Sequence, residues 1–85
     1  MSKHTYNTEG TCSHKIEFVL TPDNKVENIQ FIGGCDGNLK GLCMLCDGMK
    51  ADELIQKLSG IRCGRKSTSC PDQLSRALKK ALSKL

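Results

Sequence analysis

Six cysteines in a chain of 85 residues constrain this protein more than any other feature of its sequence. A chain of this length forms one domain, and folding buries only roughly 60–65% of the surface exposed by the unfolded chain. Large aromatic anchors are scarce, since the sequence has no Trp, one Tyr and two Phe. Small cores of this kind are often stabilised by disulfides or by a metal ion. The cysteines are therefore the first place to look for both stability and chemistry.

The cellular compartment decides between a disulfide framework and other thiol chemistry. The N-terminal stretch MSKHTYNTEG has no apolar run. We therefore expect no signal peptide, no membrane span and a cytoplasmic location. Thiols stay reduced in a bacterial-type cytosol, where clustered cysteines more often indicate metal or redox chemistry than structural bridges. In an oxidising compartment, six cysteines would allow many pairings, and the sequence does not choose among them.

The hydrophobic pattern predicts an α+β fold, with a small sheet built on one β-hairpin and covered by about three helices. Residues 15–20 and 26–32 have the alternation of strands, and the intervening TPDNK suits a turn. Pairing Leu20 with Val26 sets the hairpin register. Apolar residues at helical spacing predict three helices, over about 37–47, 51–59 and 70–84.

The chain ends and the helix boundaries complete the expected organisation. Residues 1–10 are polar, and we interpret them as a flexible N-terminal arm before a single domain over residues 11–85. Gly48 and Gly60 follow the first two helices and can terminate them. At the third helix, Ser69 has the position and chemistry of an N-cap.

Four cysteines fall outside the expected helices and strands or at their ends: Cys12, Cys35, Cys63 and Cys70. The hairpin register places Cys12 opposite Gly34, next to Cys35. Cys35 and Cys70 each lie at an expected helix N-terminus, where the helix dipole favours a thiolate. Four converging thiolates suit a tetrahedral zinc site, or alternatively an iron–sulfur site. We therefore predict a shared metal site made by these four cysteines.

Other interpretations of the cysteines stay open. The four thiols can remain metal-free, with Cys63 and Cys70 as candidate redox thiols, or they can form structural disulfides. Cys43 and Cys46 make the only C-x-x-C, which on its own suggests a redox dithiol. Both share the helix face of Leu39, however, and buried cysteine behaves as a small hydrophobic residue. We favour core packing for this pair.

The remaining candidate groups carry weaker signals. His14 lies two residues after Cys12 and could act as a ligand, although a half-exposed strand histidine is the simpler interpretation. The stretch GGCDGN could hold a phosphate at a helix start, but it lacks the lysine and hydroxyl of a P-loop. The net charge of +4 has its excess near the C-terminus. No aromatic residues interleave with these cations, so we expect no nucleic-acid binding.

The chain resembles the TSCPD domain family, whose motif stands here at residues 68–72. The resemblance also includes GTCS around Cys12, FIGGCDGN around Cys35 and GIRCGRKSTSCPDQL, so it covers roughly residues 8–82. In this family the domain occurs alone or at the C-terminal end of cobalamin-dependent ribonucleotide reductases. The resemblance implies that the family's cysteine positions, discussed as a metal or redox site, are Cys12, Cys35, Cys63 and Cys70. Cys43 and Cys46 are then additions in this chain.

The resemblance implies a function for a small module. A chain of 85 residues cannot hold the radical cofactor site, large barrel and nucleotide pocket of a reductase. We therefore expect a zinc-binding or other cysteine-site module, accessory to ribonucleotide reduction, with a reductase catalytic subunit as partner. One alternative is a thiol relay that feeds electrons to a ribonucleoside-diphosphate reductase. Another is a metal-free adaptor that docks through its basic C-terminal helix.

Overall fold

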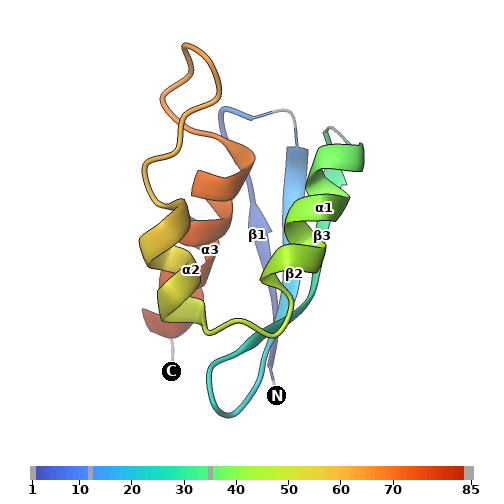
Figure 1. Ribbon diagram of the computed structural model, residues 1–85, viewed down its shortest axis with the longest axis vertical. Helices are drawn as coiled ribbons and strands as arrows, with labels where there is room; N and C mark the ends of the chain where they lie inside the picture. Colours follow the sequence, from blue (N-terminus) through green and yellow to red (C-terminus); the bar gives the residue numbers. More distant parts are fainter. Residues whose placement is uncertain (1, 12, 35, 84–85) are drawn as a thin grey trace.

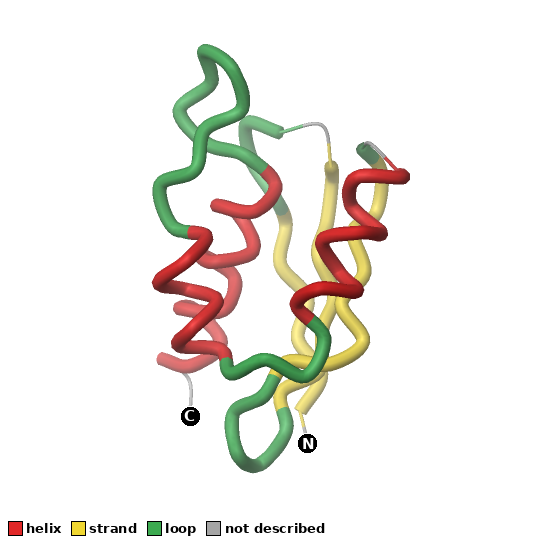
Figure 2. Tube along the Cα trace, viewed as in Figure 1, coloured by secondary structure: helices red, strands yellow, loops and turns green. Residues whose placement is uncertain are grey.

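A three-stranded antiparallel sheet lies behind the helices in Figure 1, and Figure 2 shows the same layers by element type. The computed structural model describes residues 2–11, 13–34 and 36–83. Its elements in chain order are β1 (Ser2–Asn7), β2 (Ser13–Leu20), β3 (Val26–Gly33), α1 (Asp36–Cys46), α2 (Ala51–Leu58) and α3 (Cys70–Ser83). The predicted α+β class is confirmed, and all three helices have bounds within one residue of those predicted.

The β2–β3 hairpin has the predicted register at its turn, where Leu20 pairs with Val26. Two irregularities then shift the pairing in opposite directions. The first contains Asn28, which has a left-handed φ of 54°. The second lies between Lys15 and Ser13. On the side away from the turn, Ser13 pairs with Gly33. Because the two shifts cancel, the open end of the hairpin returns to the register expected from the turn.

Residues 2–7 form strand β1, which pairs antiparallel with β2, so the prediction of a flexible arm was wrong for these residues. Alternate side chains of β1 are half-buried. The His4 ring stacks on Phe18 with centroids 5.4 Å apart, and Lys80 Nζ lies 5.8 Å from the Tyr6 ring centroid. These side-chain contacts stabilise the pairing of a polar segment with the sheet.

The core lies between one face of the sheet and the helices. Its largest fully buried apolar side chains come from β2, β3, α2 and α3: Ile16, Phe18, Leu20, Val26, Leu54, Leu74 and Leu78. Helix α1 packs on β3, α3 packs on β1 and β2, and α2 packs mainly on α3. Burying one such side chain stabilises the fold by about 1.5–3 kcal/mol, which makes this layer the main source of stability.

The outer edge of β3 is covered near its start by the segment that follows α1. Val26 donates its N–H to the Met49 carbonyl at 2.9 Å and accepts the Gly48 N–H at 2.7 Å. Farther along, the Asn28 N–H donates to Asp47 Oδ1 at 3.1 Å. These contacts use backbone groups that would otherwise be open to another strand, and they hold α1 beside the sheet.

Candidate functional site

The TSCPD motif begins α3 with the predicted N-cap. The Asp72 N–H donates to Ser69 Oγ at 3.1 Å, which satisfies one of the free donors in the first helical turn. Ser69 Oγ in turn donates to the Ile61 carbonyl at 2.7 Å. Pro71 occupies the second helical position, where its missing N–H leaves no broken bond. The motif therefore starts the helix and holds the preceding loop at the same time.

Asp72 joins the end of α2 to the start of α3. Its carboxylate accepts hydrogen bonds from the Gly60 N–H at 2.7 Å and from the Thr68 hydroxyl, and it pairs with Arg76 at 3.0 Å. Burial opposes ionisation of Asp72, but these hydrogen bonds and the Arg76 charge outweigh it and hold the pKa below its usual value. Asp72 is therefore a structural carboxylate that stays ionised at neutral pH.

A chain of side-chain hydrogen bonds extends from the motif to the segment between β1 and β2. Gln73 Nε2 donates to Thr68 Oγ1 at 2.9 Å, and Gln73 Oε1 accepts the Glu9 N–H at 3.1 Å. A Cβ added at Gly10 would lie 3.1 Å from Thr68 Cγ2, so the two segments also pack closely. Within the described residues, no buried side-chain nitrogen or oxygen lacks a hydrogen-bond partner. The sequence analysis assigned no role to Gln73, although the residue lies within the stretch GIRCGRKSTSCPDQL.

Cys70 lies against the open end of the hairpin. It is 8% exposed, and its Sγ lies 3.4 Å from Ser13 Oγ. Ser13 follows Cys12 in the chain and pairs with Gly33, which precedes Cys35 by two positions. Cys12 and Cys35 themselves lie outside the described residues, so the structure does not test their part in the predicted site.

Cys63 is exposed in the loop between α2 and α3, which projects beyond the helices in Figure 1. Its N–H donates to the Thr68 carbonyl at 3.1 Å, and its carbonyl accepts the Lys66 N–H at 3.0 Å. Gly64 turns the chain between them with a φ of 58°. The loop therefore contains a tight turn that is held by a hydrogen bond to Thr68, whose hydroxyl in turn donates to Asp72.

The described residues supply two thiols of the predicted metal site, on Cys63 and Cys70. Thiolates are soft ligands that suit zinc or an iron–sulfur cluster. Among residues 2–11, 13–34 and 36–83, however, no three His, Cys, Asp or Glu side chains are grouped to hold a metal ion. The described part of the site is thus compatible with a cysteine-ligated metal in its donor chemistry but is not a metal site by itself.

Cys43 and Cys46 pack as the sequence predicted. Cys46 belongs to the buried core cluster, and Cys43 is partly buried against it. Burial raises the pKa of both thiols, and the proximity of Cys46 raises that of Cys43 further. A higher pKa lowers the thiolate fraction at neutral pH, so the structure gives this C-x-x-C the properties of core residues rather than of a reactive dithiol.

His14 is exposed, and its ring lies over Gly33. A Cβ added at Gly33 would lie 2.6 Å from His14 Cδ2, and Gly33 has a φ of 83°. Two independent requirements thus call for glycine at this position. The backbone conformation of Gly33 and its closeness to the His14 ring therefore explain the first glycine of GGCDGN, and no phosphate is needed to explain it.

The fold and this end of the molecule define a small α+β domain in which residues 68–72 form the start of α3, with Cys70 in that helix start and Cys63 in the loop before it. A family model, the TSCPD domain, matches residues 2–82. The chain belongs to this family, which is associated with ribonucleotide reductases. No curated protein and no solved structure shows significant similarity to the chain. None of the helices in the described residues has the length and apolar character needed to cross a membrane.

Proposed function

We propose that this chain is a cysteine-site module, accessory to ribonucleotide reduction, in which Cys12, Cys35, Cys63 and Cys70 bind zinc. The observation that carries the proposal is the 3.4 Å contact between Cys70 Sγ and Ser13 Oγ. This contact places the N-terminus of α3 beside Ser13, the residue that follows Cys12 in the sequence. The reductase link rests on membership of the TSCPD family.

The described neighbours of the four cysteines support convergence at one end of the fold. The Ser13–Gly33 pair is the last pair at the open end of the hairpin, and the Cys63 N–H donates to the carbonyl of Thr68, two residues before Cys70. Zinc held by four thiolates would supply a fixed link between the hairpin, the projecting loop and α3. Because such a link forms only in the folded chain, its binding free energy would add to folding stability.

Metal analysis of freshly purified, reduced protein tests the metal part of the proposal. We expect one zinc per chain, protection of the exposed Cys63 thiol from alkylation until the metal is chelated, and a lower melting temperature after chelation. Cys70→Ser and Cys63→Ser should each lose the metal, whereas Cys43→Ser is the matched control that should keep it. Absence of stoichiometric metal from the wild-type protein, with Cys63 alkylated as fast without chelator as with it, would reject the zinc site. Co-elution with a reductase catalytic subunit tests the accessory role separately.

A thiol relay is the second candidate, and the exposure of Cys63 favours it. In a relay, the Cys63 and Cys70 thiols would form a disulfide and pass two electrons and two protons to a disulfide of the reductase. The burial of Cys70 means that the start of α3 would have to open first. Formation of a Cys63–Cys70 disulfide on mixing metal-free protein with the oxidised reductase would favour the relay over the zinc site.

A further inference from the structure

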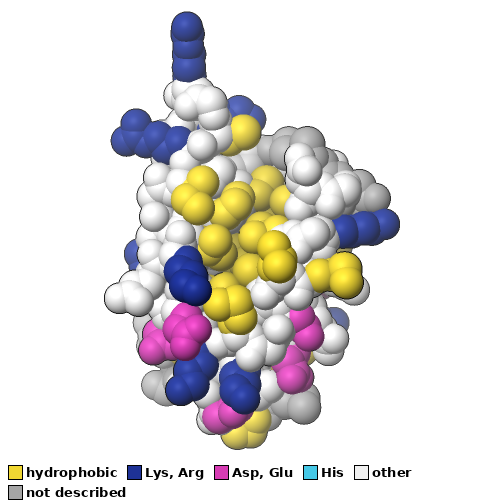
Figure 3. Space-filling model, in the orientation of Figure 1, with side chains coloured by type: hydrophobic (Ala, Val, Ile, Leu, Met, Phe, Trp, Pro, Cys, Tyr) yellow, Lys and Arg dark blue, Asp and Glu magenta, His cyan; other side chains and the backbone are white. Residues whose placement is uncertain are grey.

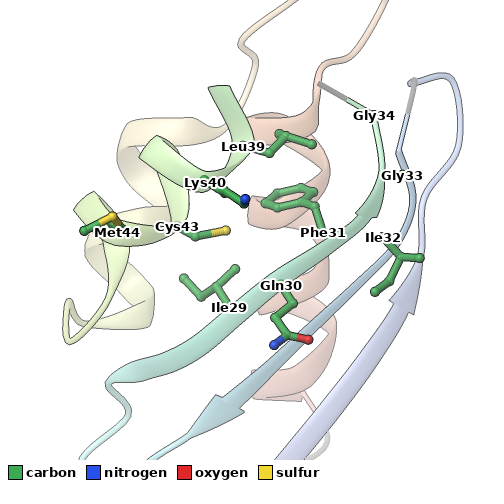
Figure 4. A pocket seen from close by; sticks show the side chains of 10 residues that line it. All are labelled: Ile29, Gln30, Phe31, Ile32, Gly33, Gly34, Leu39, Lys40, Cys43 and Met44. Atoms are coloured by element: carbon green, nitrogen blue, oxygen red, sulfur yellow. The ribbon is translucent and has the colours of Figure 1, made fainter. Parts of the chain in front are cut away.

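Helix α1 has apolar side chains on both flanks of the side that it packs on β3. Figure 4 shows Leu39 and Cys43 on the packed side, where they line a pocket against the strand. Because successive helical residues are rotated by about 100°, Met44 lies on one flank of that side, and Leu42 and Leu45 lie on the other. Met44 is 81% exposed and Leu45 is 79% exposed. The sheet thus covers only part of a helix whose residues 42–46, LCMLC, are apolar all round, a pattern typical of buried helices.

The flank that carries Leu42 and Leu45 borders a continuous apolar surface. Leu42, Ile55 and Leu58 are partly buried against the core, and Ile61, beyond the end of α2, is 41% exposed. Figure 3 shows hydrophobic side chains gathered between α1 and α2 on this face. We call the surface made by these five side chains the α1–α2 patch. Contiguous exposed apolar surface of this kind marks an interaction site.

The end of the α1–α2 patch nearest the projecting loop is basic. Residues 61–67 are exposed and contain three cations, Arg62, Arg65 and Lys66, without an acidic residue. Within the part of the chain that the structure describes, no carboxylate forms an ion pair with any of the three. This end therefore favours contact with negative charge.

The opposite end of the patch, where α1 ends and α2 begins, is acidic. Asp47, Asp52 and Glu53 are exposed there beside one cation, Lys50, and Lys57 follows a turn farther along α2. In Figure 3 the acidic side chains of this face all lie in its lower half, where lysines accompany them. The patch therefore has an apolar centre between a basic end and an end with excess negative charge.

A second copy of the chain is complementary to both the centre and the ends of this face. Rotation by 180° about an axis in the plane of the patch, across its long direction, lays one patch on the other and exchanges their ends. The basic loop, residues 61–67, of each copy then meets the acidic segment, residues 47–53, of the other. We propose that the α1–α2 patch is the interface of a two-fold symmetric homodimer. This interface goes beyond the proposed function, and the zinc content of the protein does not report on it.

The size of the face determines how tight this dimer is. In the orientation of Figure 3 the chain measures 36 by 22 Å between Cα atoms. A standard interface takes about 800 Å² from each partner, so it needs almost the whole of this face, with its charged ends as well as its apolar centre. The dimer is therefore weak and reversible, and its charged ends contribute to it.

Sedimentation equilibrium of the full chain, in reducing agent so that Cys63 cannot link two copies, tests the proposal. We expect a reversible monomer–dimer equilibrium at low salt with a dissociation constant of roughly 1–100 μM, weakened severalfold by high salt. Leu45→Gln should raise the dissociation constant at least tenfold, because a two-fold dimer loses the buried side chain twice. Ile32→Gln is the matched control: Ile32 is 43% exposed but follows Phe31 on β3 and so points to the opposite face of the sheet. It should leave the dissociation constant unchanged.

Charge reversal tests which ends meet. One variant carries Arg65→Glu and Lys66→Glu in the loop, and the other carries Asp52→Lys and Glu53→Lys at the start of α2. Each variant alone opposes like charges at both ends of the dimer and should stay monomeric, whereas an equimolar mixture restores opposite charges at both ends and should dimerise about as tightly as wild type. Circular dichroism confirms that each variant is folded.

Three results would each overturn the proposal. The first is a wild-type protein that stays monomeric at low salt and high concentration. The second is a dimer that Leu45→Gln leaves unchanged, or a mixture of the charge variants that associates no better than either alone. The third is a monomer that binds a reductase catalytic subunit through Leu45, which would assign the α1–α2 patch to that partner.

Discussion

Replacement of Asp72 by asparagine isolates the electrostatic part of the motif. Asparagine keeps the shape of the side chain but removes its charge and turns one acceptor into a donor. The Gly60 N–H can still find an oxygen, whereas Thr68 and Arg76 now meet an amide NH₂. Thr68 Oγ1 also accepts from Gln73 Nε2, so an amide NH₂ at position 72 would share its lone pairs with Gln73 and leave the Thr68 O–H without its present acceptor. The substitution therefore breaks a buried network rather than a single contact.

The expected loss can be estimated from the individual contacts. A buried hydrogen bond to a charged group contributes about 1.5–3 kcal/mol, and an acid in the first helical turn adds about 0.3–1 kcal/mol. The Arg76 side chain is 50% exposed, so its ion pair adds little beyond this. We expect Asp72→Asn to lower the free energy of unfolding by about 3 kcal/mol. For a domain of this size, that corresponds to a fall in melting temperature of roughly 12–24 °C.

The dependence on pH follows from the direction of the Asp72 pKa shift. The folded-state pKa lies below the ordinary value of an unfolded aspartate, about 3.9. The charged carboxylate therefore contributes its full stabilisation above that value, and the contribution is lost as the pH falls through the folded-state pKa. The stability difference between wild type and Asp72→Asn should be constant near neutral pH and shrink below about pH 4.

Urea denaturation of reduced, metal-free protein, followed by far-UV circular dichroism, measures this difference. Asp52→Asn is the matched control because Asp52 also lies in a first helical turn but is exposed. We expect the control to lose only about 0.3–1 kcal/mol. A loss below 1 kcal/mol in Asp72→Asn, or equal losses in the two variants, would contradict the structural role assigned to Asp72.

Three further predictions concern glycines and thiols. Gly41→Ala should stabilise by about 0.5–1 kcal/mol because a Cβ in this exposed helical position meets nothing, whereas Gly48→Ala should destabilise because its φ is 82°; thermal melts compare them. In the presence of chelator, Cys46→Ser should lower the free energy of unfolding by about 1–3 kcal/mol because it buries a hydroxyl. Cys63→Ser should lower it by less than about 0.5 kcal/mol because Cys63 is exposed, and urea titrations measure both values. Near neutral pH, Cys43 should alkylate more slowly than free glutathione by mass spectrometry, since its pKa is raised; equal rates would contradict this.

Local rules predicted most of the fold. Alternation and turn chemistry gave the β2–β3 hairpin with Leu20 opposite Val26, and Ser69 followed the rules of helix capping. These features depend on neighbours in sequence, so the sequence alone can carry them. Strand β1 could not be found in this way, because His4 and Tyr6 become half-buried only through contacts with Phe18 and α3.

The site was predictable in part for the same reason. The position of Cys70 at the start of α3 followed from the capping pattern, and the hairpin register placed the open end of the sheet correctly at Ser13. The two offsetting irregularities could not be foreseen, since a bulge at Asn28 has no strong sequence signal. Likewise, the bond from Gln73 to the Glu9 backbone joins residues 64 positions apart.

The structure separates two roles within the TSCPD motif. Thr68, Ser69 and Asp72 each have hydrogen bonds that hold the loop and the helix start, so changing them will disturb any function of this end of the domain through folding alone. Loss of activity in such variants cannot identify a metal or redox site. Cys70 is different, because the side chain that its thiol contacts in the described part of the chain is Ser13, and helix capping does not require a thiol. Cysteine-to-serine changes that preserve stability in chelator but remove metal are therefore the variants that report on function.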